Sequence, residues 1–377
     1  MLVHKAYSFR IYPTKKQTEL INQTIGCSRF VFNHFLAIWN HTYNETGKGL
    51  SYNTCSAQLP QLKQELTWLK EVDSIALQSS LQNLADAFLR FFKKQNKAPR
   101  FKSKKNHVQS YKTKQTNGNI AIIENKIKLP KLGLVRFAKS REVRGRIIHA
   151  TIRRNSTGKY FVSILGETEI TELPKTHAAI GIDLGITDFA IFSDGQKVDN
   201  IMFTTKMEKK LKREQRKLAR RALNAKKNGI PLFEAKNYQK QKRKVARLYE
   251  KVMNQRNDFL NKLTTEIIKN HDIICIEDLN VKGMLRNHKL AKAISDVSWS
   301  SFVTKLQYKA DWYGKTIVRV SRWFPSSQIC SGCGHKDGKK SLKSRSWSCS
   351  VCFTTHDRDI NASKNILAEG LRIQALA

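Results

Sequence analysis

Two closely spaced cysteine pairs constrain this chain more than any other feature of its sequence. Each pair has the form C-x2-C, and the pairs are Cys330 with Cys333 and Cys349 with Cys352. A C-x2-C turn directs two sulfur atoms at one tetrahedral ion, and a hairpin between the turns brings the second pair alongside the first. The pattern therefore predicts a structural zinc ribbon in which four thiolates hold one Zn²⁺.

The other three cysteines show no regular spacing. They are Cys27, Cys55 and Cys275, and they lie among apolar or ordinary residues. This distribution is typical of a reducing compartment. The alternative interpretation of the paired cysteines, two disulfides in a secreted module, is disfavoured because the first residues do not resemble a signal peptide.

The net charge indicates a polyanionic partner. The 377 residues include 69 Lys and Arg against 30 Asp and Glu, which gives +39. Self-repulsion of this size is costly unless a polyanion screens it, so we expect nucleic acid. A basic membrane-surface protein is the competing class, but no run of about 18 apolar residues and no lipidation signal supports it. A ribosomal-type RNA-binding protein agrees equally well with the charge, and the length suggests two or three domains.

The N-terminal part alternates between strand and helix signals. HKAYSFRIYP predicts a strand that ends at Pro13, and Thr14 is a suitable cap for the helix that follows. Asp73 or Ser74 can cap a second helix with one apolar stripe, which we expect to pack in a core. The stripe consists of Leu77, Leu81, Leu84, Phe88 and Phe91.

The opposite face of this second helix carries a polar row. Ser74, Gln78 and Gln82 recur every four residues, so they line up on one side of the helix. Glutamine can contact base edges through two hydrogen bonds, which makes these residues candidates for reading DNA. An ordinary solvated face is the simpler alternative.

Short β runs follow a basic, irregular segment. Between about residues 110 and 170, runs such as IAIIE, LVRFA and YFVSILGE are separated by Gly- and Asn-rich turns. They predict a small antiparallel barrel or sheet, to which the N-terminal strand returns. Candidates for nucleic-acid stacking and phosphate contacts there are Tyr111, Arg136, Arg153 and Arg154, although each fits an ordinary surface position as well.

A different domain begins after Pro174. AAIGIDLGI is a near-continuous apolar run, which is typical of a buried central strand. Residues 206–263 then become strongly helical and basic, with a break at 228–231, so we expect a helical hairpin. Its first helix is crowded with Lys and Arg, which favours phosphate binding over a merely solvated face. The arginine candidates are Arg213, Arg216 and Arg220.

Three carboxylates stand where apolar elements end. Asp183 and Glu277 follow buried strands, and Asp359 starts the final helix. Together they would form a hard oxygen cage suited to Mg²⁺ or Mn²⁺, which in two-ion sites hydrolyse phosphodiesters. A buried Asp is more often satisfied by a hydrogen bond than by a metal, and Asp278 or Asp357 are alternatives. The order of acid-bearing strands, helical insertion and closing helix is that of an RNase H-like nuclease of the RuvC type.

Motifs along essentially the whole chain resemble the TnpB family, transposon-encoded relatives of type V CRISPR effector nucleases. The motifs are FRIYPTKKQ, GCSRFVFN, PRFKSK, GIDLGI, IEDLN, WFPSSQICSGCG and HDRDINASKNIL. Single motifs such as GIDLG are weak. Their order, with the cysteine pairs between the second and third acids, is highly specific.

The resemblance implies an RNA-guided DNA endonuclease. Family members bind a noncoding RNA from the transposon end, recognise a short target-adjacent motif, form an RNA–DNA heteroduplex and cut DNA at one RuvC site. Carried onto this sequence, the catalytic metal ligands are Asp183, Glu277 and Asp359. The family pattern D-x-N-A selects Asp359 over Asp357. One departure is Phe353, which replaces the glycine that usually follows the second cysteine pair and puts only the turn geometry in doubt.

The resemblance also implies a multidomain α+β architecture. An RNase H-like (RuvC) α/β nuclease domain with an inserted zinc ribbon follows a helical recognition domain and a small β-barrel wedge domain. The expected boundaries are 1–14 for the first wedge strand, 15–108 for the recognition domain, 109–176 for the rest of the wedge barrel, 177–325 for the first nuclease part, 326–356 for the ribbon and 357–377 for the last nuclease part.

Partners and alternatives follow from the same resemblance. We expect a guide RNA and target DNA, Mg²⁺ or Mn²⁺ with a structural Zn²⁺, no membrane, a monomer in the RNA complex, and a prokaryotic cytoplasm near the nucleoid. An RNA-guided repressor without cleavage is one alternative, which loss of an acid would favour, yet all three acids are present. A DNA-strand-transferring transposase is the other, because it needs a similar acidic site.

Overall fold

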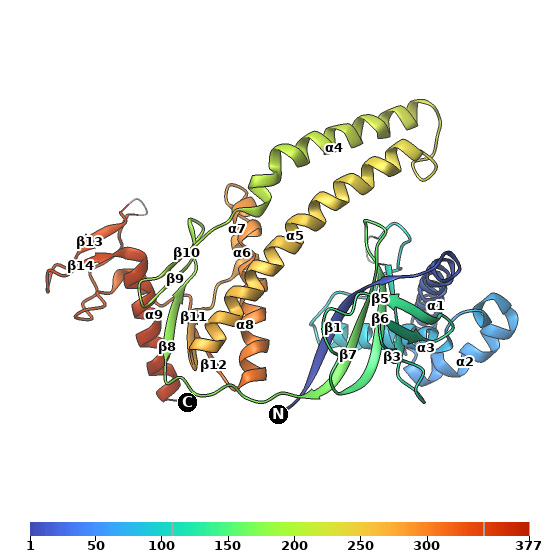
Figure 1. Cartoon of the computed structure of the whole chain (residues 1–377), viewed down its shortest axis with the longest axis horizontal. Coiled ribbons are helices and arrows are strands. Elements are labelled where there is room, and N and C mark those ends of the chain that lie inside the picture. Colours follow the sequence, from blue (N-terminus) through green and yellow to red (C-terminus); the bar gives the residue numbers. More distant parts are fainter. Residues whose placement is uncertain (107–108, 342–343, 377) are drawn as a thin grey trace. The chain divides into compact units, whose positions relative to one another are not determined.

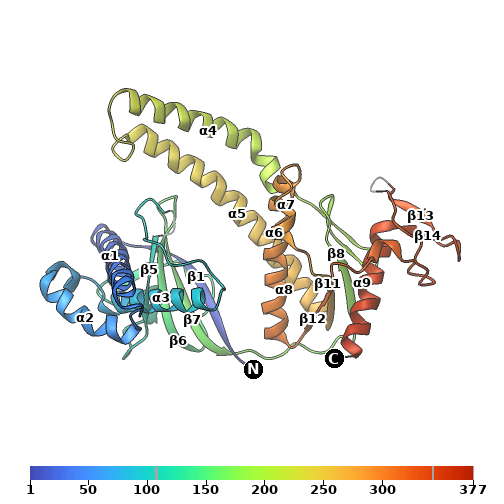
Figure 2. The same ribbon diagram turned by 180° about the vertical axis from the view of Figure 1, so that it is seen from behind.

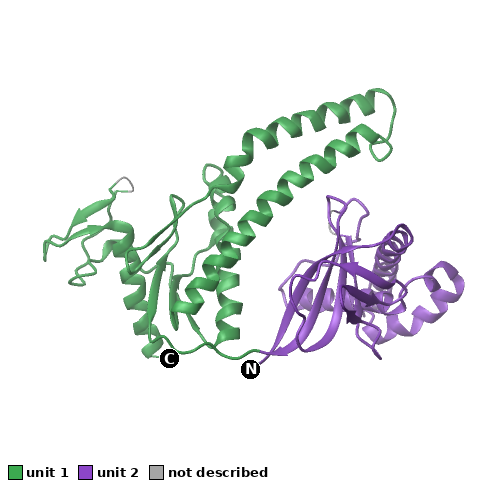
Figure 3. Ribbon diagram, viewed as in Figure 1, with its two compact units in different colours: residues 1, 170–377 green, residues 2–169 purple. Residues whose placement is uncertain are grey.

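The chain folds into two compact units. The structure is a computed structural model that describes residues 1–106, 109–341 and 344–376. One unit comprises Leu2–Glu169, and the other comprises Ile170–Ala377 together with Met1 (Figure 3). None of the helices in the described ranges is long and apolar enough to cross a membrane.

The Leu2–Glu169 unit contains a seven-stranded antiparallel sheet. Its strands are β1 (Leu2–Tyr12), β2 (Gln109–Lys114), β3 (Ala121–Ile123), β4 (Lys126–Leu129), β5 (Gly133–Phe137), β6 (Arg146–Arg154) and β7 (Tyr160–Glu169). The hydrogen-bonded order is β2-β6-β7-β1-β5-β4-β3, so the N-terminal strand returns between β7 and β5 as its alternating sequence predicts. Closure of this sheet into a barrel stays a prediction.

Three helices complete this unit (Figure 1). They are α1 (Lys15–Thr46), α2 (Tyr52–Glu65) and α3 (Ser74–Phe92), with a short 3₁₀ turn, η1 (Thr67–Lys70), before α3. Thr14 caps α1 in a reciprocal capping box with Gln17, and Asp73 caps α3, as expected from the sequence. The stripe of α3 is buried except at its end, where Phe91 is 37% exposed. The prediction that Phe91 belongs to the core is therefore wrong, because α3 runs past its packing partners.

The second unit is built on a five-stranded mixed sheet. Its strands are β8 (Ala179–Asp183), β9 (Asp188–Phe192), β10 (Lys197–Asp199), β11 (Ile273–Glu277) and β12 (Thr316–Val320), in the order β10-β9-β8-β11-β12. β8, β11 and β12 run parallel, whereas β9 and β10 are antiparallel to their neighbours. Parallel strands end at one edge of a sheet, so the residues that close β8, β11 and β12 come together there.

Helices cover both faces of this sheet (Figures 1 and 2). The helices of this unit are α4 (Phe203–Lys227), α5 (Lys236–Asn270), α6 (Val281–Met284), α7 (Ala291–Val297), α8 (Trp299–Tyr313) and α9 (Arg358–Ala375). Of these, α5 and α8 pack on one face of the sheet and α9 packs on the other. Side chains alternate between the faces of a strand, so Ile274 and Ile276 of β11 pack with α5 and α8. Cys275 lies on the other face, where it packs with Ile366 of α9.

The basic hairpin consists of α4 and α5 and is longer at both ends than the expected 206–263. Buried Glu214 of α4 ties the helices together, because Gln241 of α5 donates to its carboxylate at 2.8 Å and Lys244 lies 3.2 Å from it. At the base, Asp296 of α7 accepts hydrogen bonds from Arg256 and from the backbone N–H of Thr204. These contacts hold a hairpin whose surface is otherwise densely cationic.

A small ribbon lies between β12 and α9. It contains a 3₁₀ turn, η2 (Ser326–Gln328), and a two-stranded hairpin of β13 (Ser346–Ser348) and β14 (Thr355–Asp357). A backbone bridge joins Ile329 to Lys336 across the first cysteine turn. The chain therefore leaves the sheet after β12, forms two cysteine turns and returns to the sheet as α9.

Candidate functional site

Asp183 and Glu277 end neighbouring parallel strands. Ile182 of β8 pairs with Ile276 of β11, so the two acids that follow stand side by side at the same edge of the sheet. Asp183 has the same side-chain parity as Gly181, and Glu277 has that of Cys275. Both acids therefore project on the face that α9 covers.

Close packing of α9 brings the third acid to this edge. A Cβ atom on Gly181 would lie 2.1 Å from the backbone oxygen of Ser363, and one on Gly370 would lie 2.3 Å from the sulfur of Cys275. Only glycine allows such an approach between strand and helix. Asp359 lies in the first turn of α9, close enough for its charge to act on Asp183.

The three acids form one acidic centre, in which the charges of Glu277 and Asp359 act on Asp183. Burial, reinforced by the charges of Glu277 and Asp359, raises the pKa of Asp183 to about 7. Burial also raises the pKa of Glu277, although Arg322 opposes that shift. Carboxylates that resist ionisation in this way gain most from a divalent cation, because its charge replaces their repulsion. The donor set, three carboxylates at one edge, fits a hard cation such as Mg²⁺ or Mn²⁺.

Arg345 of the ribbon partly neutralises this centre, and sequence reasoning missed it. Its Nη1 donates to Oδ2 of Asp359 at 2.9 Å, and its Nη2 donates to Oγ1 of Thr187 at 3.4 Å. The signal was weak, because Arg345 is one of several basic residues between the cysteine pairs. Its position links the ribbon to the carboxylate edge.

The two alternative aspartates have other partners. Asp357 caps α9 by accepting from the backbone N–H groups of Asp359 and Ile360, and Lys197 lies 2.6 Å from it. Burial opposes the shift, but these donors hold the pKa of Asp357 below its ordinary value. Asp278 pairs with Arg322 at 2.5 Å. Both carboxylates are therefore held by donors of the protein itself.

A recess of about 220 Å³ lies beside Glu277. Trp299 borders it, and the indole N–H of Trp299 is buried without a hydrogen-bond partner among the described residues. Arg319 and Thr304 contribute polar atoms to the same wall. The edge that carries the acids is therefore hollowed and partly polar.

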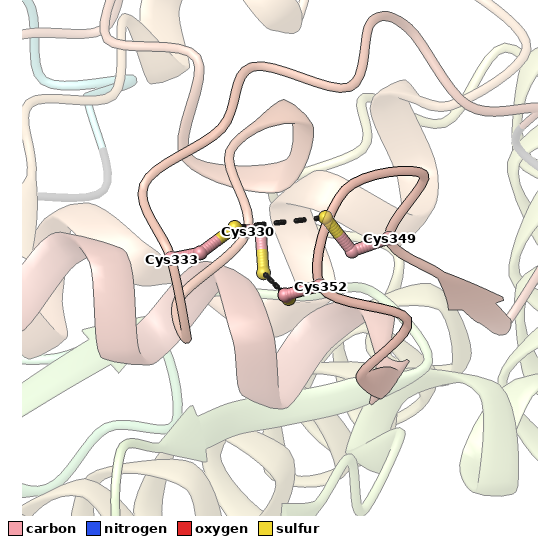
Figure 4. Close-up of side chains that lie close together, drawn as sticks. All are labelled: Cys330, Cys333, Cys349 and Cys352. Atoms are coloured by element: carbon pink, nitrogen blue, oxygen red, sulfur yellow. Dashed lines mark hydrogen bonds between the residues drawn. The ribbon is translucent and has the colours of Figure 1, made fainter.

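The four paired cysteines meet in one cluster (Figure 4). The sulfur of Cys330 lies 3.5 Å from that of Cys352, and the sulfur of Cys333 lies 3.7 Å from that of Cys349. Four thiolates at about 2.3 Å from a tetrahedral Zn²⁺ are separated by about 3.8 Å, so the cluster fits this ion. In the described ranges it is the only group of three or more His, Cys, Asp or Glu side chains with all ligand atoms within 4.8 Å. The three acids are therefore more widely spread than the sulfurs.

His356 adds a contact that the cysteine spacing does not reveal. Its Nε2 lies 3.0 Å from the sulfur of Cys330, and its ring packs near Trp347. A hydrogen bond to a coordinating sulfur orients that ligand and tunes its charge. Phe353 takes a left-handed backbone conformation, with φ of +57°, and keeps the turn that glycine usually makes.

The polar row on α3 lies at the surface as expected, but Tyr111 does not. Ser74 and Gln78 are exposed and Gln82 is partly exposed, while Ser74 accepts from Lys63 and Gln82 donates to Asp86. Tyr111 is only 5% exposed within the core of the sheet unit. The prediction that it stacks on nucleic acid is corrected, because its ring faces the hydrophobic side of β2.

The arginine candidates are all exposed. Arg153 and Arg154 end β6 and lie over the rings of Phe161 and Tyr160. On α4, Arg213 lies 3.5 Å from Glu214, while Arg216 and Arg220 face solvent. Arg136 is exposed too, over Tyr12. Exposure is necessary for contacts with phosphate, and the contacts themselves stay a prediction.

Three family models match the chain. Residues 162–288 match the OrfB_IS605 model, described as a probable transposase, and residues 299–366 match the TNB domain of Cas12f1-like proteins. Residues 1–48 match a model described as a helix-turn-helix domain, although here they form β1 and one long helix, α1.

Two curated relatives match almost the full length. One from Streptomyces pristinaespiralis, named "Putative RNA-guided DNA endonuclease", is 37% identical over 99% of this chain and 91% of its own. This chain belongs to the TnpB family. InsQ of Escherichia coli (strain K12), which carries the same description, is 33% identical over 98% of this TnpB chain and 93% of its own.

A solved structure shares the fold of this TnpB protein. It is the cryo-EM structure of a Cas12f1–sgRNA–target DNA complex, which aligns with a TM-score of 0.59 at 13% identity. The alignment covers 97% of this chain and 98% of the other chain. The likeness therefore extends over both units.

Proposed function

We propose that this TnpB protein is an RNA-guided DNA endonuclease whose cleavage site consists of Asp183, Glu277 and Asp359. The observation that carries the proposal is the meeting of three acids, from β8, β11 and α9, at one edge of the mixed sheet. The full-length relatives named as RNA-guided DNA endonucleases support the substrate class. We assign an RNase H-like, RuvC-type fold to this sheet and its helices.

The acids would hold Mg²⁺ or Mn²⁺, and the cysteines would hold Zn²⁺. A pair of divalent ions supplies an activated water and stabilises the leaving oxygen of a phosphodiester. The three acids would hold these ions at a rigid strand edge, where Asp359 pairs with Arg345. The cysteine cluster offers four sulfurs and so leaves no open position, which makes its role structural.

Guide RNA and target DNA are the proposed partners. The charge of +39 needs a polyanion, and the fold is shared with a protein solved in complex with guide RNA and target DNA. We assign RNA and DNA backbone contacts to Arg153, Arg154 and the α4 arginines. Ser74, Gln78 and Gln82 are our candidates for reading the target-adjacent motif, because they share one exposed face of α3.

We also propose the finer division of the chain. In this division, residues 15–108 form the recognition domain, and 1–14 with 109–176 form the wedge barrel. Residues 177–325 and 357–377 form the nuclease domain around the ribbon at 326–356. The helices of the recognition domain and the strands of the wedge barrel lie in one compact unit. The boundary between these two domains therefore divides their proposed roles within a single folded body.

The decisive experiment removes one carboxylate at a time. In purified protein–RNA complexes, Asp183→Ala, Glu277→Ala and Asp359→Ala should each reduce DNA cleavage by about 100-fold or more, because each removes a cation ligand. RNA and target binding should stay close to wild type, since these depend on the cationic surface. The matched control is Asp357→Ala, which removes a helix cap and should lose stability before it loses chemistry.

Strand transfer is the second function to test, because one matching family model is described as a probable transposase. The same complexes should yield cut DNA with free ends and no joined products. If wild-type protein gave joined products and Asp183→Ala did not, the function of this site would be strand transfer in place of hydrolytic cleavage. Activity of Asp359→Ala alongside inactivity of Asp357→Ala would show that Asp357, and not Asp359, holds the cation.

A further inference from the structure

Trp323 is the most exposed large hydrophobic residue in the described part of the chain. The residue is 87% exposed. Burying a tryptophan is strongly favourable, and an indole left in water is therefore unusual unless it meets a partner. The residue belongs to the WFPSSQ segment, which links β12 to the ribbon.

The position of Trp323 relates it directly to the carboxylate edge. Val320, the last residue of β12, pairs with Glu277, and the backbone N–H of Asp278 donates to the carbonyl of Val320 at 2.9 Å. Trp323 follows Val320 by three residues. It therefore stands just beyond the edge of the sheet at which Glu277 and Asp183 end.

The backbone around Trp323 is fixed on both sides. Phe324 packs beside α9 in the same apolar cluster as Val320, and its N–H donates to the carbonyl of Ser321 at 2.9 Å. On the other side, Arg322 pairs with Asp278 at 2.5 Å. The indole is thus presented to solvent from a closed turn, and its exposure is not the result of a loose chain end.

The surroundings favour a nucleic-acid ligand. Arg319 and Arg322 are exposed beside the turn and share one acidic partner, Asp278, so the pair keeps one positive charge in excess. The chain as a whole carries +39. A cationic surface with an exposed aromatic ring is the usual combination for unpaired nucleotides, whose bases stack on the ring while the phosphates meet the cations. Bases within a duplex already stack on one another and offer no free face.

We propose that Trp323 stacks on a nucleobase of the single DNA strand that enters the carboxylate site, and so positions the neighbouring phosphate for cleavage. The proposal rests on the assignment of Asp183, Glu277 and Asp359 as the cleavage site. Trp323 is a positioning residue, since it holds the strand through a base and does not contact the reacting atoms.

Three substitutions separate stacking from bulk. Trp323→Ala should slow cleavage of target DNA by about 5- to 150-fold, the range that corresponds to ~1–3 kcal/mol per stacked base. Trp323→Phe should keep most of the rate, whereas Trp323→Leu, which is apolar without an aromatic face, should resemble Ala. The thermal midpoint should not change, because the side chain makes little contact. Phe233→Ala, at another exposed aromatic residue in the α4–α5 connection, is the matched control and should leave the rate unchanged.

A scan with abasic nucleotides provides the decisive test. Cleavage by wild-type protein should slow markedly when the base at one position near the cut is missing. Cleavage by Trp323→Ala should be insensitive to a missing base at that same position. The two losses in rate would therefore not add. Additive losses at every position, or an unchanged rate for Trp323→Ala, would overturn the stacking proposal. Cleavage by Asp183→Ala at the wild-type rate would instead overturn the site assignment, so the two failures are distinguishable.

Discussion

Phe353 shows how a single residue can keep a turn at a cost in strain. It follows the second cysteine pair with φ of +57°, a left-handed conformation that a residue with a Cβ atom rarely adopts, and the residue is 78% exposed. Its N–H donates to the carbonyl of Cys349 at 3.1 Å, so the turn closes despite the strain. The departure from glycine at this position therefore affects stability and leaves the four sulfurs in place.

We predict that Phe353→Gly stabilises the ribbon. Removing the Cβ clash should raise the free energy of unfolding by about 1 kcal/mol, partly offset by the greater freedom of glycine in the unfolded chain. Thermal unfolding of the zinc-loaded protein measures the gain, and zinc content should stay at one ion per chain. Phe353→Ala keeps the Cβ and should show no gain. Equal midpoints for the Gly and Ala variants would contradict the strain argument.

The ionisation of Asp183 makes the folding stability of the protein depend on pH. Its pKa is raised to about 7 in the folded protein, from an ordinary value of 3.8. As pH rises from about 4 to 7, the unfolded chain releases this proton before the folded chain does, so folding stability decreases. Above about pH 7, Asp183 is ionised in both the folded and the unfolded chain, and folding stability decreases no further on its account.

We predict that Asp183→Asn abolishes this decrease in folding stability between pH 4 and 7. Without added divalent metal, the variant should match wild type near pH 4 and exceed it by about 1–3 kcal/mol in free energy of unfolding at pH 8. Asp278→Asn is the control, since Asp278 has an arginine partner and its replacement should bring no gain. A constant difference between Asp183→Asn and wild type across this pH range would show that Asp183 ionises normally.

At the scale of elements, α9 determines whether the site exists. The helix carries Asp359 and reaches the sheet only because Gly181 and Gly370 have no side chain. The contact at Gly181 is with backbone, which cannot rotate away as a flexible side chain would. The distance between helix and strand is therefore set by these two positions.

We predict that Gly181→Ala displaces α9. The added methyl group meets the backbone oxygen of Ser363, so stability should fall by about 1–3 kcal/mol. DNA cleavage should fall more steeply, up to about 100-fold, because a shift of about 1 Å misplaces Asp359. Gly26→Ala within α1 meets open space and should be neutral or stabilising. Full cleavage by Gly181→Ala would mean that the geometry tolerates the displacement.

At the scale of the whole molecule, the excess of cations determines the response to salt. The charge of +39 is concentrated in part on the α4–α5 hairpin, where Glu214 is buried and the arginines point outward. Each phosphate contact releases counterions, so affinity for RNA falls as salt rises. The slope of log affinity against log salt is therefore proportional to the number of phosphate contacts.

We predict that replacing Arg213, Arg216 and Arg220 together with Gln lowers the slope of log affinity against log salt. For single-stranded RNA the reduction should be about 2, at about 0.7 for each lost contact. The corresponding triple Lys variant keeps the charge and should retain the slope. Titrations of guide RNA at several salt concentrations measure it. An unchanged slope in the Gln variant would place RNA contacts elsewhere.

Features that depend on neighbouring residues in the chain could be predicted from the sequence. Thr14 and Asp73 cap helices because their oxygens accept free backbone N–H groups, wherever the rest of the chain lies. Apolar runs mark β8 and β11 as buried strands, and the C-x2-C spacing brings two sulfurs to each turn. The two acids at the strand ends follow from the same runs, since parallel strands end at one edge.

Other features depended on contacts between residues far apart in the chain, which no local pattern encodes. Tyr111 lies on an alternating strand, and only the packing of the sheet decides that its ring faces the core. Phe91 continues the stripe of α3 beyond the neighbours that could cover it. The pairing of Arg345 with Asp359, and the approach of α9 to Gly181, arise only when the chain returns from the ribbon to the sheet. Periodicity determines which face a side chain occupies, whereas the partner on that face is decided by how the elements pack in space.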